Sequence, residues 1–133
     1  MTATLANKKP LIFIVEDNLA YRVLLARMLE KRGYMVMLFQ NGKEALDMLA
    51  YSKPDVILSD IEMPRMNGFD LFDNVKKVYP KSQIPFLYLS SSQSSETITE
   101  AFRRSKNEML GKPVDLEDLY NQLENTVVKK KTA

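Results

Sequence analysis

The residues most capable of chemistry follow short apolar runs of the sequence. Glu16 and Asp17 follow the first run, Asp60 follows the third, Ser90 ends the fourth and Lys112 follows the fifth. If these runs are parallel strands of one sheet, their carboxyl ends meet at a common edge, where such sheets bind ligands. Three carboxylates would then crowd into one volume, and a nearby lysine or a bound cation would relieve their repulsion. The all-oxygen ligand set favours Mg²⁺, with Mn²⁺ as the alternative.

Such a site suits the transfer of a phosphoryl group. Mg²⁺ keeps several waters and binds one or two carboxylates together with a phosphate, so a phosphoryl donor has a place in the site. One carboxylate can then act as the nucleophile and form an acyl phosphate. Lys112 and the metal would neutralise the charge on the group being transferred.

The composition excludes most other chemistry. The 133 residues include no histidine, cysteine or tryptophan. This excludes disulfides, thiol nucleophiles and cysteine-based zinc sites, and it excludes histidine catalysis and a phosphohistidine carrier. The 19 basic and 17 acidic side chains give a net charge of +2, without the basic stripe that nucleic-acid binding requires. No apolar run approaches the roughly 20 residues of a membrane span, so we expect a cytoplasmic protein with no membrane partner and no direct nucleic-acid partner.

Five short apolar runs predict strands, and the amphipathic segments between them predict helices. The strands are expected at Leu11–Val15, Met35–Phe39, Val56–Leu58, Phe86–Leu89 and Met109–Leu110. At least four of these runs lack polar alternation, which is typical of a parallel sheet covered on both faces. Alternating strands and helices favour an α/β, doubly wound fold with a five-stranded parallel sheet. The expected strand order is the flavodoxin-like 2-1-3-4-5, with helices on both faces.

Capping residues and helical spacing locate the helices. Asn18 is expected to cap the first helix, which ends at Gly33, and the second begins near Asn41. Apolar side chains at helical spacing mark the other three helices. The third is marked by Phe72, Val75 and Tyr79, and the fourth by Ile98, Ala101 and Phe102. The fifth follows the cap Asp115 and is marked by Leu116, Leu119, Leu123 and Val127.

Three segments of the sequence match a known family. Val15–Asn18, Leu58–Gly68 and Gly111–Pro113 closely resemble the receiver domain of bacterial two-component response regulators, as found in single-domain, chemotaxis-regulator-like receivers. The resemblance runs from about residue 9 to residue 128, which leaves 1–8 and 129–133 as short tails. It implies a phosphoacceptor signalling module that catalyses only its own phosphorylation and dephosphorylation, and is otherwise not an enzyme.

The resemblance assigns a role to each candidate residue. It implies that Asp60 is the phosphoacceptor, that Asp17 binds Mg²⁺ directly and that Glu16 holds the metal through water. The main-chain carbonyl of Glu62 would complete the protein ligands of the metal. Lys112 would pair with the phosphoryl oxygens, and the resemblance also implies a cis peptide between Lys112 and Pro113.

Several residues depart from the family pattern. Ser90 stands where threonine is more frequent, but it keeps the hydroxyl that would hydrogen-bond the phosphoryl group and report its arrival. Ser91 stands where a small alanine is common, and Glu16 replaces the more usual aspartate. Met109 occupies the position of an aromatic switch residue; methionine can fill the same space but offers no phenol.

The sequence leaves two alternative functions open. An aspartyl-nucleophile, Mg²⁺-dependent phosphohydrolase would also use a strand-end aspartate, with Glu62 at the spacing of a general acid. A phosphorylation-independent receiver would act only as a binding module.

The resemblance also implies partners. The phosphoryl donor would be a histidine kinase or a histidine phosphotransfer protein, docking on the first helix around Tyr21 and Leu25. The output would pass to a downstream protein, from a monomer or a phosphorylation-dependent homodimer formed through the fourth helix, the fifth strand and the fifth helix.

Overall fold

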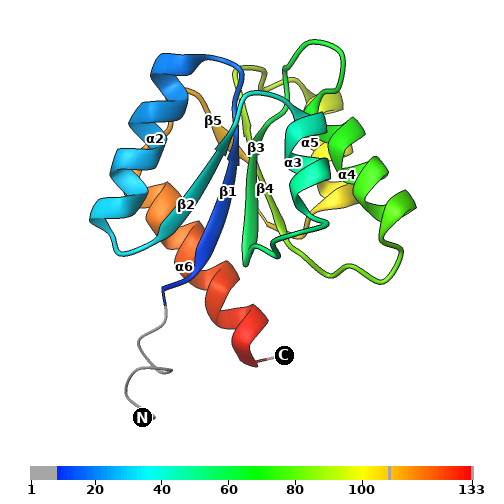
Figure 1. Cartoon of the computed structure of the whole chain (residues 1–133). Helices are drawn as coiled ribbons and strands as arrows, with labels where there is room; N and C mark the ends of the chain where they lie inside the picture. Colours follow the sequence, from blue (N-terminus) through cyan, green and yellow to red (C-terminus); the bar gives the residue numbers. More distant parts are fainter. Residues whose placement is uncertain (1–8, 108, 133) are drawn as a thin grey trace.

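Strands and helices alternate along the chain (Figure 1). Within residues 9–107 and 109–132, which a computed structural model describes, there are five strands and five helices. In chain order they are β1 (Leu11–Val15), α2 (Leu19–Lys31), β2 (Met35–Phe39), α3 (Gly42–Met48), β3 (Val56–Asp60), α4 (Gly68–Val78), β4 (Phe86–Ser90), α5 (Ser95–Arg104), β5 (Leu110–Gly111) and α6 (Leu116–Thr132).

The strands form one parallel sheet in the order β2-β1-β3-β4-β5, which confirms the predicted topology. The register pairs Val15 of β1 with Ser59 of β3, and Asp60 of β3 with Leu89 of β4. The residues that follow β1 therefore lie beside the ends of β3 and β4. This register brings the polar residues to one edge of the sheet.

Helices cover both faces of the sheet, as predicted: α2 and α6 lie on one face, and α3, α4 and α5 on the other (Figure 1). Each face has its own hydrophobic cluster, with Ile12, Ile14 and Leu58 in the first and Phe13 and Ile57 in the second. Every residue of β3 and β4 is buried, because these strands lie inside the sheet and under helices. Asp60 and Ser90 are thus carried by fully buried strands.

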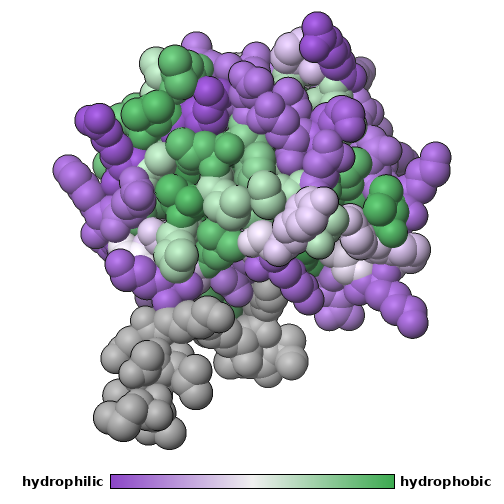
Figure 2. All heavy atoms as spheres, viewed as in Figure 1, coloured by the Kyte–Doolittle hydropathy of each residue, from purple (hydrophilic) through white to green (hydrophobic). Residues whose placement is uncertain are grey.

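The edge strand β2 is less covered than the central strands. Met35 is 53% exposed and Leu38 is 41% exposed. Figure 2 shows hydrophobic side chains gathered in the middle of this face of the molecule, over β2.

Local hydrogen bonds begin and end the helices. The side chains of Asn18 and Asn41 accept the predicted capping bonds from the main-chain N–H groups of Tyr21 and Glu44. The chain leaves α2 through Gly33, whose φ of 91° lies in the left-handed region that glycine adopts readily. Asn67 and Asp70 form a reciprocal capping box at the start of α4, which was not predicted from the sequence. This box begins α4 soon after β3 and so confines the loop beside Asp60.

Several sequence expectations were wrong in detail. The fifth strand is Leu110–Gly111 and not Met109–Leu110. Phe102 lies on the helix that it was expected to mark, but its side chain is 62% exposed. Leu25 was expected on the docking surface of the first helix, but it is completely buried.

The predicted domain was bounded by two short tails, at residues 1–8 and 129–133. The expected tail 1–8 lies outside the described residues. Helix α6 continues to Thr132, past the expected boundary at residue 128. Within the described part of the chain, no helix is both long and apolar enough to cross a membrane.

Candidate functional site

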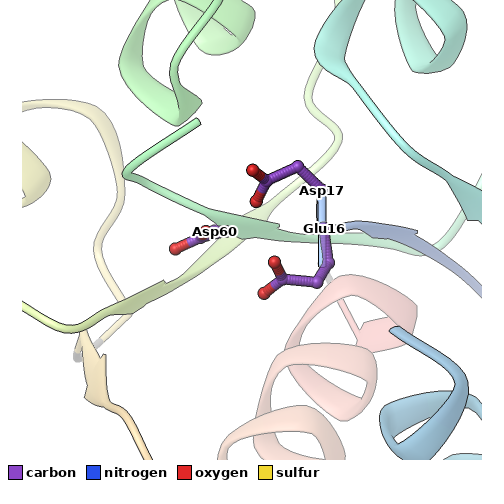
Figure 3. A group of neighbouring side chains, drawn as sticks. All are labelled: Glu16, Asp17 and Asp60. Carbon is purple, nitrogen blue, oxygen red and sulfur yellow. The ribbon is translucent and has the colours of Figure 1, made fainter. Parts of the chain in front are cut away.

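Three carboxylates converge at the carboxyl edge of the sheet (Figure 3). Glu16 and Asp17 directly follow β1, and Asp60 is the last residue of β3. One oxygen from each carboxylate lies within 4.8 Å of the others. Glu16 and Asp60 are buried, whereas Asp17 is exposed at the mouth of the site. The predicted convergence of these residues is confirmed by their geometry.

Lys112 supplies the cation that faces these carboxylates. Its Nζ lies 2.6 Å from Oε1 of Glu16 and 3.1 Å from Oδ2 of Asp60. The cis peptide between Lys112 and Pro113 is present, as the family resemblance implied. The main-chain N–H of Lys112 donates to the carbonyl of Ser90 at 2.9 Å, which fixes the lysine beside the end of β4. The sheet therefore positions the lysine as well as the acids.

The surroundings of Asp60 and Lys112 shift their pKa values upward. Burial raises the pKa of Asp60 to about 6, and the nearby Glu16 carboxylate adds to this increase, while Lys112 opposes it. Burial alone would lower the pKa of Lys112, but its pairing with Glu16 and Asp60 outweighs burial and raises that pKa. The lysine therefore keeps its positive charge at neutral pH, and Asp60 is ionised above about pH 6.

The donor set fits a hard divalent cation. Asp60 Oδ1 is buried and, among the described residues, has no hydrogen-bond partner. Both oxygens of Glu16 are used, one by Lys112 and the other by the main-chain N–H of Asn18. Three carboxylates against one lysine leave net negative charge in a small volume, and only oxygen atoms are offered as ligands. Asp17 and Asp60 are the residues with oxygens available for direct coordination.

Ser90 lies at the end of β4 and is completely buried. Its hydroxyl donates to Oε2 of Glu62 at 2.7 Å. This contact of the Glu62 side chain was not predicted from the sequence, which suggested the Glu62 carbonyl as a metal ligand and the side chain only as a candidate general acid. The Ser91 hydroxyl and main-chain N–H both donate to Oε1 of the same carboxylate. The departure from alanine at Ser91 was the only sequence signal for this arrangement.

The loop between β3 and α4 approaches Asp60 closely. A Cβ atom on Gly68 would lie 2.5 Å from the carbonyl oxygen of Asp60 and 3.0 Å from Cα of Ile61, so only glycine fits here without a shift. The N–H of Gly68 donates to the carbonyl of Ile61 at 2.9 Å. This contact holds the start of α4 against the strand that carries Asp60.

Met109 is not among the polar residues of the site. It is half-buried and packs against the hydrophobic cluster that contains Tyr88 and Ala101. Tyr88 is buried, stacks edge-on against Phe69 at 5.3 Å between ring centroids, and contributes an aromatic ring to this region. The methionine thus fills space between the sheet and its helices.

Comparisons with known proteins agree with this geometry. A family profile described as the response regulator receiver domain matches residues 12–124. The two-component response regulator ORR3 of Oryza sativa subsp. indica is 32% identical over 130 residues, which are 97% of this chain and 98% of that protein. The solved structure of the chemotaxis protein CheY4 from Vibrio cholerae has a TM-score of 0.82 and 28% identity, covering 90% of this chain and 99% of that chain.

A longer relative matches only in part. The DNA-binding transcriptional regulator NtrC of Escherichia coli strain K12 is 29% identical over 120 residues, which are 90% of this chain. The chain spans about a quarter of the length of that regulator, since the match covers 25% of it.

Proposed function

The chain belongs to the response regulator receiver domain family, and from this premise we propose that Asp60 is the residue that accepts the phosphoryl group. A receiver domain is a signalling module of two-component systems. The observation that carries the proposal is the setting of Asp60. It is a buried strand-end carboxylate beside Lys112 and two further acids, and one of its oxygens has no partner in the described part of the chain.

The proposed reaction forms an acyl phosphate on the Asp60 side chain. An oxygen of the ionised carboxylate attacks the phosphorus of the donor, the bond from phosphorus to the donor's leaving group breaks, and that group leaves with the bonding electrons. Lys112 stabilises the negative charge on the transferring group, because its ammonium already lies 3.1 Å from Asp60. The Ser90 hydroxyl then donates a hydrogen bond to a phosphoryl oxygen.

The same residues would hold Mg²⁺. Asp17, Asp60 and the main-chain carbonyl of Glu62 are the proposed direct ligands, with Glu16 acting through water. When bound, the metal supplies positive charge to the phosphoryl oxygens. This assignment is supported by the net negative charge and the all-oxygen donors of the carboxylate group.

The phosphoryl donor is proposed to be a histidine kinase or a histidine phosphotransfer protein, acting in the cytoplasm. The sequence holds no histidine, so it offers no phosphohistidine of its own. Leu19 and Leu24 of α2 are 64% and 45% exposed, and they replace the buried Leu25 as candidate contacts of the donor. The output is proposed to reach a downstream protein after phosphorylation, with Ser90 and Met109 as the switch residues.

The geometry gives less support to a phosphohydrolase. That alternative needs Glu62 as a general acid directed at a leaving group. Both oxygens of the Glu62 carboxylate instead accept hydrogen bonds from Ser90 and Ser91.

Intact-mass spectrometry tests the proposed function. The native chain, incubated with Mg²⁺ and acetyl phosphate, should gain the mass of one phosphoryl group, and chelation of the metal should suppress the adduct. Asp60→Asn should gain none, whereas Asp47→Asn, which changes an exposed acid on α3, should behave like the native chain. An equal adduct in Asp60→Asn would contradict the proposal, and continuous hydrolysis of a phosphate ester would favour the phosphohydrolase.

A further inference from the structure

We propose that the Glu62 side chain is a latch that holds the hydrogen-bond donors of Ser90 and Ser91 in the resting protein and is displaced when Asp60 is phosphorylated. The inference rests on the proposed role of Asp60 and names a residue that opposes the phosphorylated state. It concerns the side chain of Glu62, in addition to the proposed metal-binding role of its carbonyl.

Three hydrogen bonds form the latch. Ser90 Oγ donates to Oε2 of Glu62 at 2.7 Å. The Ser91 main-chain N–H donates to Oε1 at 2.9 Å, and the Ser91 hydroxyl donates to the same oxygen at 3.1 Å. One carboxylate therefore joins the loop after β3 to the loop after β4, and it uses both of its oxygens to do so.

The Ser90 hydroxyl cannot serve Glu62 and a phosphoryl group at once. A serine hydroxyl carries one proton and so makes one strong donated hydrogen bond. Its other acceptor in the structure is the carbonyl of Ser92, at 2.9 Å. The carboxylate is closer and charged, and charge-assisted hydrogen bonds are the stronger kind. Donation to a phosphoryl oxygen on Asp60 therefore requires that Glu62 be released.

Burial decides which of the two side chains moves. Ser90 is completely buried, whereas Glu62 is exposed. An exposed carboxylate regains water when it leaves, so its release costs little beyond the three hydrogen bonds. A phosphoryl group carries about two negative charges at neutral pH and so repels a neighbouring carboxylate. Phosphorylation of Asp60 would thus both compete for the Ser90 proton and drive Glu62 toward solvent.

Ser91 strengthens the resting arrangement. Its hydroxyl supplies the third contact to Glu62, which a small apolar side chain at this position could not make. The latch therefore stabilises the unphosphorylated form, and it raises the concentration of phosphoryl donor needed to populate the phosphorylated form. A ligand shifts such an equilibrium only through its different affinity for the two forms.

Titration with beryllofluoride and Mg²⁺ tests the latch, because beryllofluoride mimics a phosphoryl group on aspartate. The informative variant is Glu62→Asp, which keeps the charge but is one methylene too short to span both serines. We expect it to bind beryllofluoride about tenfold more tightly, as the loss of charge-assisted hydrogen bonds in the resting form implies. Ser91→Ala changes no charge and should bind only about threefold more tightly, because it removes the longest of the three hydrogen bonds, an exposed one at 3.1 Å.

One matched control variant separates the latch from other causes. Glu30→Asp makes the same chemical change on the exposed surface of α2 and should leave the affinity unchanged. If Glu62 acted only through its negative charge, Glu62→Asp and Ser91→Ala would bind beryllofluoride with native affinity, and this result would overturn the proposal.

An NMR measurement without beryllofluoride tests the resting contact by itself. The Ser91 amide should resonate downfield in the native chain and move upfield, with faster hydrogen exchange, in Glu62→Asp. An unchanged Ser91 amide would overturn the latch even if Asp60 were phosphorylated normally. Failure of the native chain to bind beryllofluoride would count against the proposed function instead, since the amide measurement does not depend on it.

Discussion

The ammonium of Lys112 lies 3.1 Å from Oδ2 of Asp60, yet the pKa of Asp60 is raised to about 6. Burial is the largest cause of this increase, and the negative charge of Glu16 is the second. Lys112 is shared between the two carboxylates, which limits how strongly it can stabilise the ionised form of Asp60. The protein thus holds the Asp60 carboxylate in a setting that disfavours its ionised form when no metal is bound.

This setting predicts how stability changes with pH. The pKa of Asp60 is about 6 in the folded protein and 3.8 in its unperturbed form. Ionisation of Asp60 therefore does not lower the free energy of unfolding below pH 3.8, and it lowers that free energy by its full amount above pH 6. Asp60→Asn removes that cost. In a chelating buffer the variant should be more stable than the native chain at pH 7.5, by up to about 3 kcal/mol.

Urea denaturation from pH 4 to pH 8 measures this difference in the free energy of unfolding. The advantage of Asp60→Asn should shrink as the pH falls from about 6 to about 4. A difference that stays constant over this range would show that ionisation of Asp60 is not its cause.

Metal binding should reverse part of this cost. At pH 7.5 we expect Mg²⁺ to raise the melting temperature of the native chain, because a cation that binds only the folded state stabilises that state. At a Mg²⁺ concentration of a hundred times the dissociation constant, the free energy of unfolding should rise by about 2.7 kcal/mol. Asp17→Asn should lose most of this response, whereas Asp47→Asn should keep it, as thermal denaturation at increasing Mg²⁺ would show. An undiminished response in Asp17→Asn would remove Asp17 from the ligand set.

Gly68 should tolerate no side chain. Gly68→Ala would place a methyl group 2.5 Å from the main-chain oxygen of Asp60, and backbone cannot yield as a side chain can. We expect a loss of about 2 kcal/mol in the free energy of unfolding, together with weaker Mg²⁺ binding. The control is Gly42→Ala, whose methyl would meet the flexible side chain of Met66. Equal stability of the two variants would contradict this account of the loop.

The Tyr88 hydroxyl should be dispensable for stability. It is buried and has no hydrogen-bond partner among the described residues, so Tyr88→Phe removes an uncompensated polar group. We expect a gain of about 1 kcal/mol in the free energy of unfolding. Tyr21→Phe should instead lose about 1 kcal/mol, because the Tyr21 hydroxyl accepts a hydrogen bond from the main-chain N–H of Val114. Denaturant titration of both variants measures this contrast, and a loss in Tyr88→Phe would reveal an unrecognised partner.

Much of the fold could be predicted because the signals were local. Apolar runs of five residues specified β1 and β2, and the caps at Asn18 and Asn41 specified where two helices begin. The short strand β5 could not be located in this way, because two residues carry no periodicity. Phe102 correctly marked α5, but its exposure could not be predicted because it depends on how α5 lies against the sheet.

The sequence was enough to predict which residues lie together in the site, but not which of their side chains form hydrogen bonds with one another. Glu16, Asp17, Asp60 and Lys112 could be placed together because parallel strands end at a common edge. The contacts of the Glu62 side chain could not, since they depend on the conformations of two loops that the sequence does not specify. Likewise, the pKa of Asp60 depends on burial, which follows from packing by elements far apart in the chain.

If Asp60 accepts the phosphoryl group, the modification can be located at that residue by chemical trapping. After incubation with acetyl phosphate and Mg²⁺, borohydride reduction converts an aspartyl phosphate into homoserine, which peptide mass spectrometry can locate. We predict homoserine at position 60 alone, at a level that falls when the metal is chelated. Homoserine at position 17, or an adduct that does not include position 60, would contradict this role of Asp60.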